Sequence, residues 1–183
     1  TGVQTCALPI SHTEIYKDIS DVYEKKRDFP KAIEAYKNYL DEMKSSPDIS
    51  DLFLYGRLNY YAATDSAYQD KQPTYLAEAD TIFAQVAVKV PDNYLGNFWR
   101  ARVNSLRDPE TTQGLAKPYY EAALSILEQK PDATKSVLVE CNSYLGYYYF
   151  VKEDYNQSKQ YWNKILEIDP ENETATKALG GIK

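Results

Sequence analysis

The residues that could carry out chemistry in this chain are few and scattered. It holds one histidine, His12, and two cysteines, Cys6 and Cys141, among 183 residues. Imidazole and thiolate groups are the commonest nucleophiles, general bases and transition-metal ligands, so little remains for those roles. The sequence also lacks the phosphate-binding, metalloprotease, nucleophile-elbow and dithiol motifs G-x-x-x-x-G-K, H-E-x-x-H, G-x-S-x-G and C-x-x-C. We therefore expect no catalytic, cofactor-binding or metal-binding residues, and no enzyme activity.

The remaining reactive side chains favour structural interpretations. Cys141 lies three residues before Tyr144 and four before Leu145, on the apolar side of an expected helix, which favours a buried, inert thiol. His12 lies near the terminus, where a solvated side chain is expected. The acidic residues of 167–173 could pair for hydrolysis, but they cover a turn and two helix ends, so a solvated face is favoured.

Composition and charge indicate a folded domain that does not attract nucleic acid. Hydrophobic residues make up 43% of the chain and charged residues 26%, which is typical of a domain with a sizeable core. The net charge is -6 and the isoelectric point is about 4.9, so phosphate backbones and anionic lipids are repelled. No apolar run approaches the ~20 residues that cross a bilayer. We expect no nucleic-acid partner and no transmembrane segment.

The first ten residues, TGVQTCALPI, do not have the pattern of a targeting segment. They lack a basic region, and their short apolar stretch contains Pro9. The segment resembles the translation of a widely used short-read sequencing adapter, whose codons give these ten residues in order. We therefore expect residues 1–11 to be an adapter-like artefact and residues 12–183 to form a single domain. Cys6 would then be foreign, and the natural N-terminus, with any signal peptide, would be missing.

A proline followed by an acidic residue recurs at intervals of about forty residues. The four pairs are at 47–48, 91–92, 131–132 and 170–171. Proline cannot continue a helix, and an acid after it suits the positive end of the next helix. We predict four units of two helices each and a C-terminal helix that caps the last unit. The units are expected at about 12–46, 48–90, 92–130 and 132–169, and the cap at 171–182.

Apolar residues recur at helical spacing inside these units. The second helix of the first unit, for example, carries Ala32, Tyr36 and Leu40 on one face. Asp28 and Asp154 each precede such a second helix and are predicted to be its N-cap.

The first and last units also share a motif. Residues 16–23 have the pattern Y-x2-I-S-x2-Y and residues 32–36 have A-x3-Y, while residues 142–149 have N-x2-L-G-x2-Y and residues 158–162 have S-x3-W. The sequence therefore resembles the tetratricopeptide repeat (TPR) family, whose pattern is W-x2-L-G-x2-Y…A-x3-F…P. It is also similar to TPR proteins of the Bacteroidota, which are commonly periplasmic, and that location is implied by analogy alone.

The middle units depart from the pattern. Arg100 stands where the third unit should have leucine, and an insertion separates the motif halves of the second unit. Residues 62–74 of that insertion form either an extended first helix with a loop at Gln72-Pro73 or a long functional connection.

The resemblance implies an all-α fold, a right-handed α-solenoid of about four TPR-like helix pairs plus a capping helix. In such solenoids the first helices line a concave face that can hold an extended peptide or a partner helix. Aromatic residues and arginine are enriched at binding hot spots. The residues of these types that the register directs to the concave face are Phe53, Arg57, Tyr60, Phe98, Arg102, Tyr147 and Phe150. Alternatively, the phenylalanines and Tyr60 pack between repeats, whereas the two arginines favour the groove.

We therefore expect a non-enzymatic protein–protein interaction scaffold that needs no cofactor and binds a protein or peptide partner of unknown identity. On this hypothesis Arg57→Glu or Arg102→Glu weakens partner capture and leaves the melting temperature nearly unchanged. Two alternatives stay open. The chain is the regulatory C-terminal arm of a larger enzyme or sensor, or it is a periplasmic module that binds glycan or peptidoglycan through exposed tyrosines.

Overall fold

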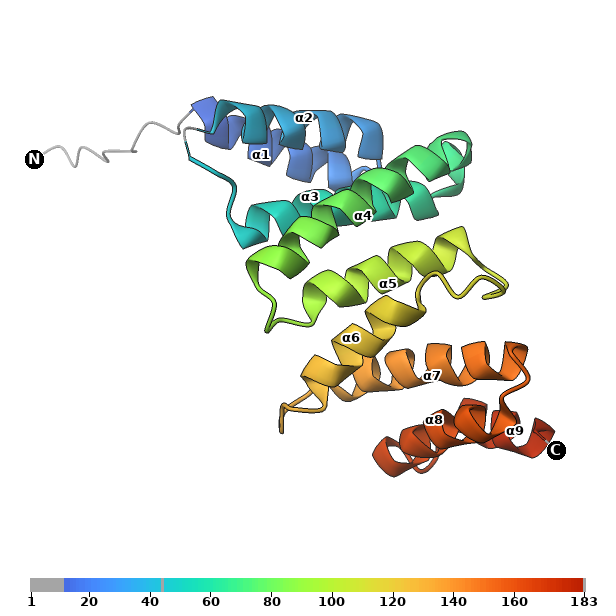
Figure 1. Cartoon of the computed structure of the whole chain (residues 1–183). Coiled ribbons are helices and arrows are strands. Elements are labelled where there is room, and N and C mark those ends of the chain that lie inside the picture. The colour runs from blue at the N-terminus through green and yellow to red at the C-terminus, as the bar shows by residue number, and fades with distance from the viewer. Residues whose placement is uncertain (1–11, 44, 183) are drawn as a thin grey trace, which may run out of the picture.

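The computed structural model describes residues 12–43 and 45–182, and within them it contains helices and no strand. The adapter-like segment 1–11 lies outside the described residues, as does the side chain of His12. The helices are α1 (His12–Lys25), α2 (Phe29–Glu42), α3 (Ile49–Thr64), the 3₁₀ helix η1 (Ser66–Lys71), α4 (Gln72–Lys89), α5 (Leu95–Arg107), α6 (Lys117–Leu127), α7 (Lys135–Val151), α8 (Tyr155–Ile168) and α9 (Glu173–Gly181) (Figure 1).

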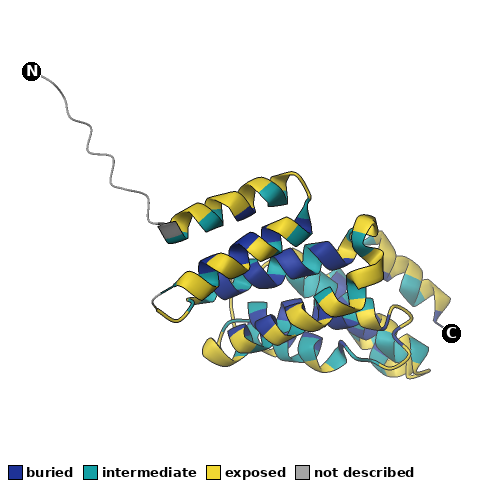
Figure 2. Ribbon diagram, turned by 90° about the horizontal axis from the view of Figure 1, so that it is seen from above, coloured by how far each residue is buried: buried dark blue, intermediate teal, exposed yellow. Residues whose placement is uncertain are grey.

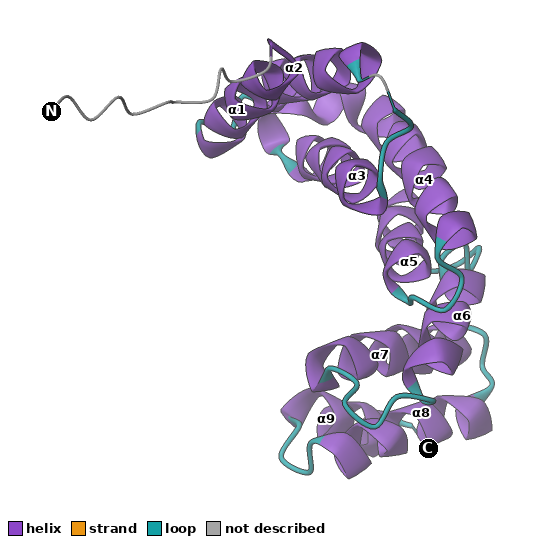
Figure 3. Cartoon of the chain, turned by 90° about the vertical axis from the view of Figure 1, so that its left-hand side faces the viewer, coloured by secondary structure: helices purple, strands orange, loops and turns teal. Residues whose placement is uncertain are grey.

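The helices stack as antiparallel pairs along the chain. α1 packs against α2, α3 against α4, α5 against α6 and α7 against α8, and the second helix of each pair contacts the next element. Figure 3 shows that the stack is bent, with α3, α5 and α7 on the inner side and α4 and α6 on the outer side. The predicted helical solenoid with a C-terminal helix on its last pair is thus confirmed.

Aspartates begin several helices, as predicted for two of them. The side chains of Asp28 and Asp154 accept the backbone N–H three residues later and so cap α2 and α8. Asp48, after the first of the repeated prolines, caps α3 in the same way. Asp92 and Asp132 do not cap a helix, because short turns separate them from α5 and α7.

Small residues let the two helices of a pair approach closely. In the first pair the Ser20 hydroxyl donates to the carbonyl of Ala32 at 2.8 Å. In the last pair the arrangement is exchanged, because the Ser158 hydroxyl on the second helix donates to the carbonyl of Gly146 on the first, also at 2.8 Å. Both serines are buried, so each hydroxyl is satisfied by one bond between the paired helices.

Glycine at the same contact makes room for an aromatic ring. A Cβ atom on Gly56 would lie 2.8 Å from the ring of Phe83, and one on Gly146 would lie 2.7 Å from the indole of Trp162. These distances are shorter than van der Waals contact, so the rings of Phe83 and Trp162 occupy the space in which the side chain of any residue other than glycine would lie. Phe83 and Trp162 therefore set the spacing of the two helices in the second and the last pair.

The insertion in the second unit differs from both expectations. α3 ends at Thr64, η1 follows, and α4 begins at Gln72 with Pro73 in its first turn. Proline has no backbone N–H, but an N–H in the first turn of a helix has no acceptor within the helix, so nothing is lost there. Pro73 therefore lies at the start of α4 and not in the expected loop. η1 folds back on the first unit, because the ring of Tyr68 packs edge-on against Phe29 at 6.4 Å.

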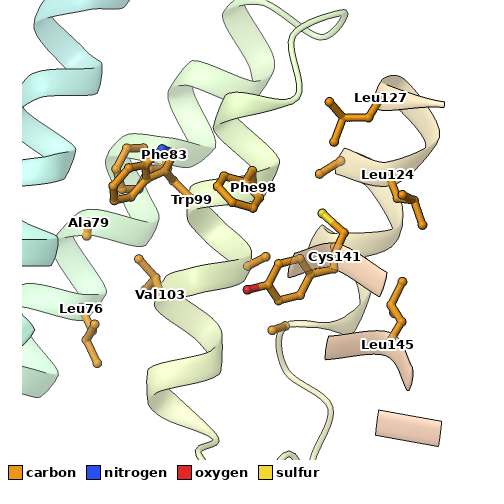
Figure 4. Packing of buried hydrophobic residues seen from close by; sticks show 14 of the residues in the cluster. Leu76, Ala79, Phe83, Phe98, Trp99, Val103, Leu124, Leu127, Cys141 and Leu145 are labelled. Carbon is orange, nitrogen blue, oxygen red and sulfur yellow. The ribbon is translucent and has the colours of Figure 1, made fainter. Parts of the chain in front are cut away.

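A continuous core joins the middle and last units (Figure 4). Phe83 and Trp99 stack with ring centroids 5.4 Å apart, and Cys141 lies fully buried at the far side of the cluster. Burial raises the pKa of the Cys141 thiol to about 12, so the thiol stays protonated at neutral pH. The predicted buried, inert cysteine is confirmed.

Candidate functional site

The candidate site is the inner face of the bend, which α3, α5 and α7 line (Figure 3). All seven residues predicted for a partner surface lie on these three helices, but they differ in burial and in their contacts. The structure divides them into an aromatic cluster around α3 and α5, an ion pair between α5 and α7, and an open groove at the end of α7.

The aromatic cluster is centred on Trp99. The rings of Phe53 and Tyr60 meet the indole edge-on, with centroids 5.7 Å and 5.2 Å away. Phe53 and Tyr60 are half-buried and Trp99 is almost completely buried, so the cluster offers ring edges to solvent. Trp99 was not among the residues predicted for the partner surface. Its position directly after Phe98 could have indicated that one of the two aromatic side chains contacts α3.

Phe98 itself does not belong to the surface. It is only 3% exposed, and its ring packs against Tyr120 of α6 at 6.3 Å. Successive residues on a helix are about 100° apart, so the ring of Phe98 points to α6 while the indole of Trp99 points to α3. Phe98 is therefore a packing residue, in contact with the second helix of its own unit, and we remove it from the candidate partner-binding residues.

Arg102 joins two units through an ion pair with Glu140. Its Nε donates to Oε1 of Glu140 at 2.7 Å, and a second guanidinium nitrogen donates to Oε2. The guanidinium also lies over the rings of Phe98 and Trp99, at 4.5 Å and 5.0 Å. The hydrogen bonds to Glu140 raise the pKa of Arg102. This side chain is held by α7 and is not a free donor for a partner.

The ion pair gives a reason to expect that Arg102→Glu lowers the melting temperature, in contrast to the expectation from sequence. The variant places a second carboxylate beside Glu140, so we expect it to lower the free energy of unfolding by about 1 to 3 kcal/mol. Urea denaturation followed by tryptophan fluorescence measures the change. The double reversal Arg102→Glu/Glu140→Arg should recover at least half of the loss. Lys177→Glu, in the exposed pair with Glu173, is the control and should change little.

Arg57 is the arginine that remains available. Its side chain is 31% exposed, and its guanidinium lies over the ring of Tyr61 at 5.2 Å. The nearest carboxylate oxygen belongs to Glu24 and is 3.9 Å away, too long for a direct hydrogen bond. The terminal donors of Arg57 are therefore not taken up by that carboxylate.

The open groove lies between the end of α7 and the end of α9. Tyr147 and Phe150 are each 42% exposed and form one wall. The groove encloses about 210 Å³, and its other lining residues are Trp162, Lys177, Ala178, Gly181 and Ile182. Lys177 is the one charged side chain among them, so the groove presents mainly hydrocarbon and aromatic surface to solvent.

Comparison with solved structures identifies the fold. The chain superposes on the crystal structure of the C-terminal part of a TPR repeat-containing protein from Cytophaga hutchinsonii, with a TM-score of 0.79 and 32% sequence identity. The chain thus has a TPR-type fold. The match covers 91% of this chain but 60% of the Cytophaga chain. No protein-family model and no curated protein matches the sequence.

Two structures of the protein MamA share the TPR-type fold. MamA from Desulfovibrio magneticus RS-1, from position 41 to the end, superposes with a TM-score of 0.65, and a double mutant of MamA RS-1 with 0.66. In both cases the identity is 18%, and the match covers 93% of this chain and 82% of the other. At this identity the likeness concerns the fold alone.

The described residues contain neither a cluster of metal-ligand side chains nor a helix that could span a membrane. Across 12–43 and 45–182 no three histidine, cysteine or acidic side chains are grouped so that they could hold a metal ion. In the same ranges no helix has the length and apolar character needed to cross a bilayer.

Proposed function

We propose that this chain is a non-enzymatic interaction scaffold whose inner face binds an extended segment or a helix of a protein partner. TPR-type neighbours support a protein–protein interaction scaffold in general, and such repeats are typically non-enzymatic. A bent stack of helix pairs offers one continuous inner surface along which a partner segment can lie.

The single observation that supports this site best is the exposure of Tyr147 and Phe150. In α3 the residue at the position of Phe150 is Tyr60, which the next unit covers with Trp99. In α7 that position stays open, because α9 has 9 residues and ends beside it at Gly181. Complete burial of a large apolar side chain contributes about 1.5 to 3 kcal/mol, and each of these two side chains forgoes the part that belongs to its exposed 42%. A partner side chain that fills the groove recovers part of it.

The chemistry of the inner face indicates what the partner segment carries. The groove accepts an aliphatic or aromatic side chain, because hydrocarbon surface makes up most of its wall. Towards α3, Arg57 can donate to a carbonyl or carboxylate oxygen, and the ring edges of Phe53 and Tyr60 can meet an apolar side chain. We therefore infer a partner segment with an apolar anchor and, at a distance along the chain, an acceptor for Arg57.

Peptides selected from a displayed random library test this proposal. We expect Phe150→Ala to weaken binding of a selected peptide about tenfold or more, because an aromatic anchor wall is removed. Fluorescence anisotropy with the labelled peptide gives the dissociation constant. The matched control is Val88→Ala on α4, since Val88 is 81% exposed and lies away from the inner face. Unchanged affinity in both Phe150→Ala and Tyr147→Ala would show that the groove is not the site.

A further inference from the structure

The outer face of α1 carries an uncovered apolar stripe. Ile15, Ile19 and Val22 are 43%, 37% and 49% exposed and follow one another at helical spacing along a single face. Figure 2 shows α1 exposed over most of its length. The stripe borders a shallow hollow of about 290 Å³, whose rim carries Asp18 and Lys26. Three aliphatic side chains on one helix face are more than the scattered exposure usual at a protein surface.

The corresponding positions in other first helices are buried. Correspondence is counted from the small residue at the contact with the second helix, which is Ser20 in α1. In α3 the corresponding residues are Asp51, Tyr55 and Leu58, which are 3%, 9% and 3% exposed. In α7 the first two are Cys141 and Leu145, which are completely buried, and the third is the half-buried Tyr148. The stripe is thus a contact surface of the repeat, left open in one unit.

In each of those units the cover is the second helix of the preceding unit. Tyr36 of α2 stacks on Tyr55 at 6.0 Å with the two rings nearly parallel. Leu124 and Leu127 of α6 share one buried cluster with Cys141 and Leu145. The covering helices also share a sequence pattern, a small residue followed four positions later by an aromatic one. The pattern is Ala32-x3-Tyr36 in α2 and Ala79-x3-Phe83 in α4, and in α6 it is Ala116-x3-Tyr120, which begins at the N-cap residue of the helix.

Two other occupants fit less well. The shortest covering helix, α6, has 11 residues and needs a connection to α7 besides, so residues 1–11 are too few to supply both. A second copy of the chain would have to present its own α1 stripe or the groove at Tyr147 and Phe150, because the apolar faces of its α2, α4 and α6 are buried inside its own stack. Neither surface would repeat the contact between consecutive units of this chain, which joins a second helix to a first helix.

We propose that the stripe of Ile15, Ile19 and Val22 docks the second helix of a further repeat, N-terminal to α1 in the same polypeptide. This helix carries the small-x3-aromatic pattern and is joined to α1 by a short turn.

A graft tests whether the stripe accepts such a helix. A copy of residues 29–48, which comprise α2 and the connection that follows it, is joined directly to Thr13. Ser20 of α1 then follows the grafted Asp48 at the same distance in sequence at which Gly56 of α3 follows Asp48 in the chain. We expect the fused chain to melt about 4 °C or more above the chain that starts at Thr13. Ile19→Glu should lower the melting temperature more in the fused chain than in the unfused one, in which the side chain is 37% exposed. A fused chain whose grafted helix carries Tyr36→Glu is the control and should lose the gain.

The natural gene provides the second measurement. We expect the reading frame upstream of position 12 to encode a helix with the small-x3-aromatic pattern, followed by a short turn. Three results would overturn the proposal: no gain in melting temperature from the graft, an upstream frame without such a helix, or dimers of the unfused chain that Ile19→Glu abolishes. The last would identify a second copy as the occupant. A failure of peptide binding at Phe150 affects none of these readouts, so the two proposals stand or fall separately.

Discussion

Phe83→Ala is expected to lower the free energy of unfolding by about 3 to 5 kcal/mol. Phe83 is completely buried in α4, stacks on Trp99 and meets the ring of Phe53 at 5.9 Å. Removing the ring leaves a cavity where the second and third units meet. Urea denaturation followed by circular dichroism measures the loss, and a change below about 1 kcal/mol would contradict this account of the core.

The same ring predicts a coupling with Gly56. Gly56→Ala places its Cβ 2.8 Å from the ring and should cost about 1 to 3 kcal/mol in the natural background. In the Phe83→Leu background the clash is relieved, so the cost should fall by at least half. Gly180→Ala is the control, because its Cβ meets nothing within 4 Å and alanine favours the helix. Equal costs of Gly56→Ala in both backgrounds would show that the ring does not set the helix spacing.

Asp51→Ala is the second change with a large expected effect. The Asp51 side chain is 5% exposed and accepts hydrogen bonds from Lys17 at 3.2 Å, from the Tyr36 hydroxyl at 3.2 Å and from the Tyr39 hydroxyl at 3.1 Å. Removing the carboxylate leaves two buried hydroxyls without their acceptor and an ammonium without its partner. We expect a loss of about 3 to 5 kcal/mol in the free energy of unfolding.

The amide variant separates the charge of Asp51 from its hydrogen bonds. Asp51→Asn keeps an acceptor for the hydroxyls and loses the attraction to Lys17, so its loss should lie between zero and that of Asp51→Ala. Lys17→Met, which removes the ammonium at a side chain that is 32% exposed, should cost less than Asp51→Ala. The same urea titrations compare the three variants. If Asp51→Ala and Asp51→Asn were equally stable, the hydroxyl bonds would contribute nothing.

Local signals explain why the helix pairs could be predicted. The apolar spacing of residues such as Ala32, Tyr36 and Leu40 and the capping aspartates Asp28 and Asp154 act within a few residues of each other, so they are visible in sequence. The solenoid follows, because a helix pair of this kind buries its apolar face only by stacking on another. The position of η1 did not follow, since Pro73 is equally compatible with a loop and with the first turn of a helix.

The candidate site was predictable only in part, because its state depends on partners distant in the chain. Arg102 was expected to be free, and nothing near it in sequence indicates Glu140, which lies on another unit. The openness of the groove at Tyr147 and Phe150 likewise depends on where α9 ends. Residue type and register therefore located the inner face, whereas cross-unit contacts determined which side chains on it are accessible.

The exchanged hydroxyl bonds have a consequence for how such units tolerate change. In the first unit the hydroxyl belongs to Ser20 and the carbonyl to Ala32, and in the last unit the hydroxyl belongs to Ser158 and the carbonyl to Gly146. Every residue supplies a carbonyl, so either helix can be the acceptor as long as the other carries a serine. In these two units the hydroxyl and the small partner can therefore change places between the paired helices, and two different pairs of amino acids make the same bond of 2.8 Å.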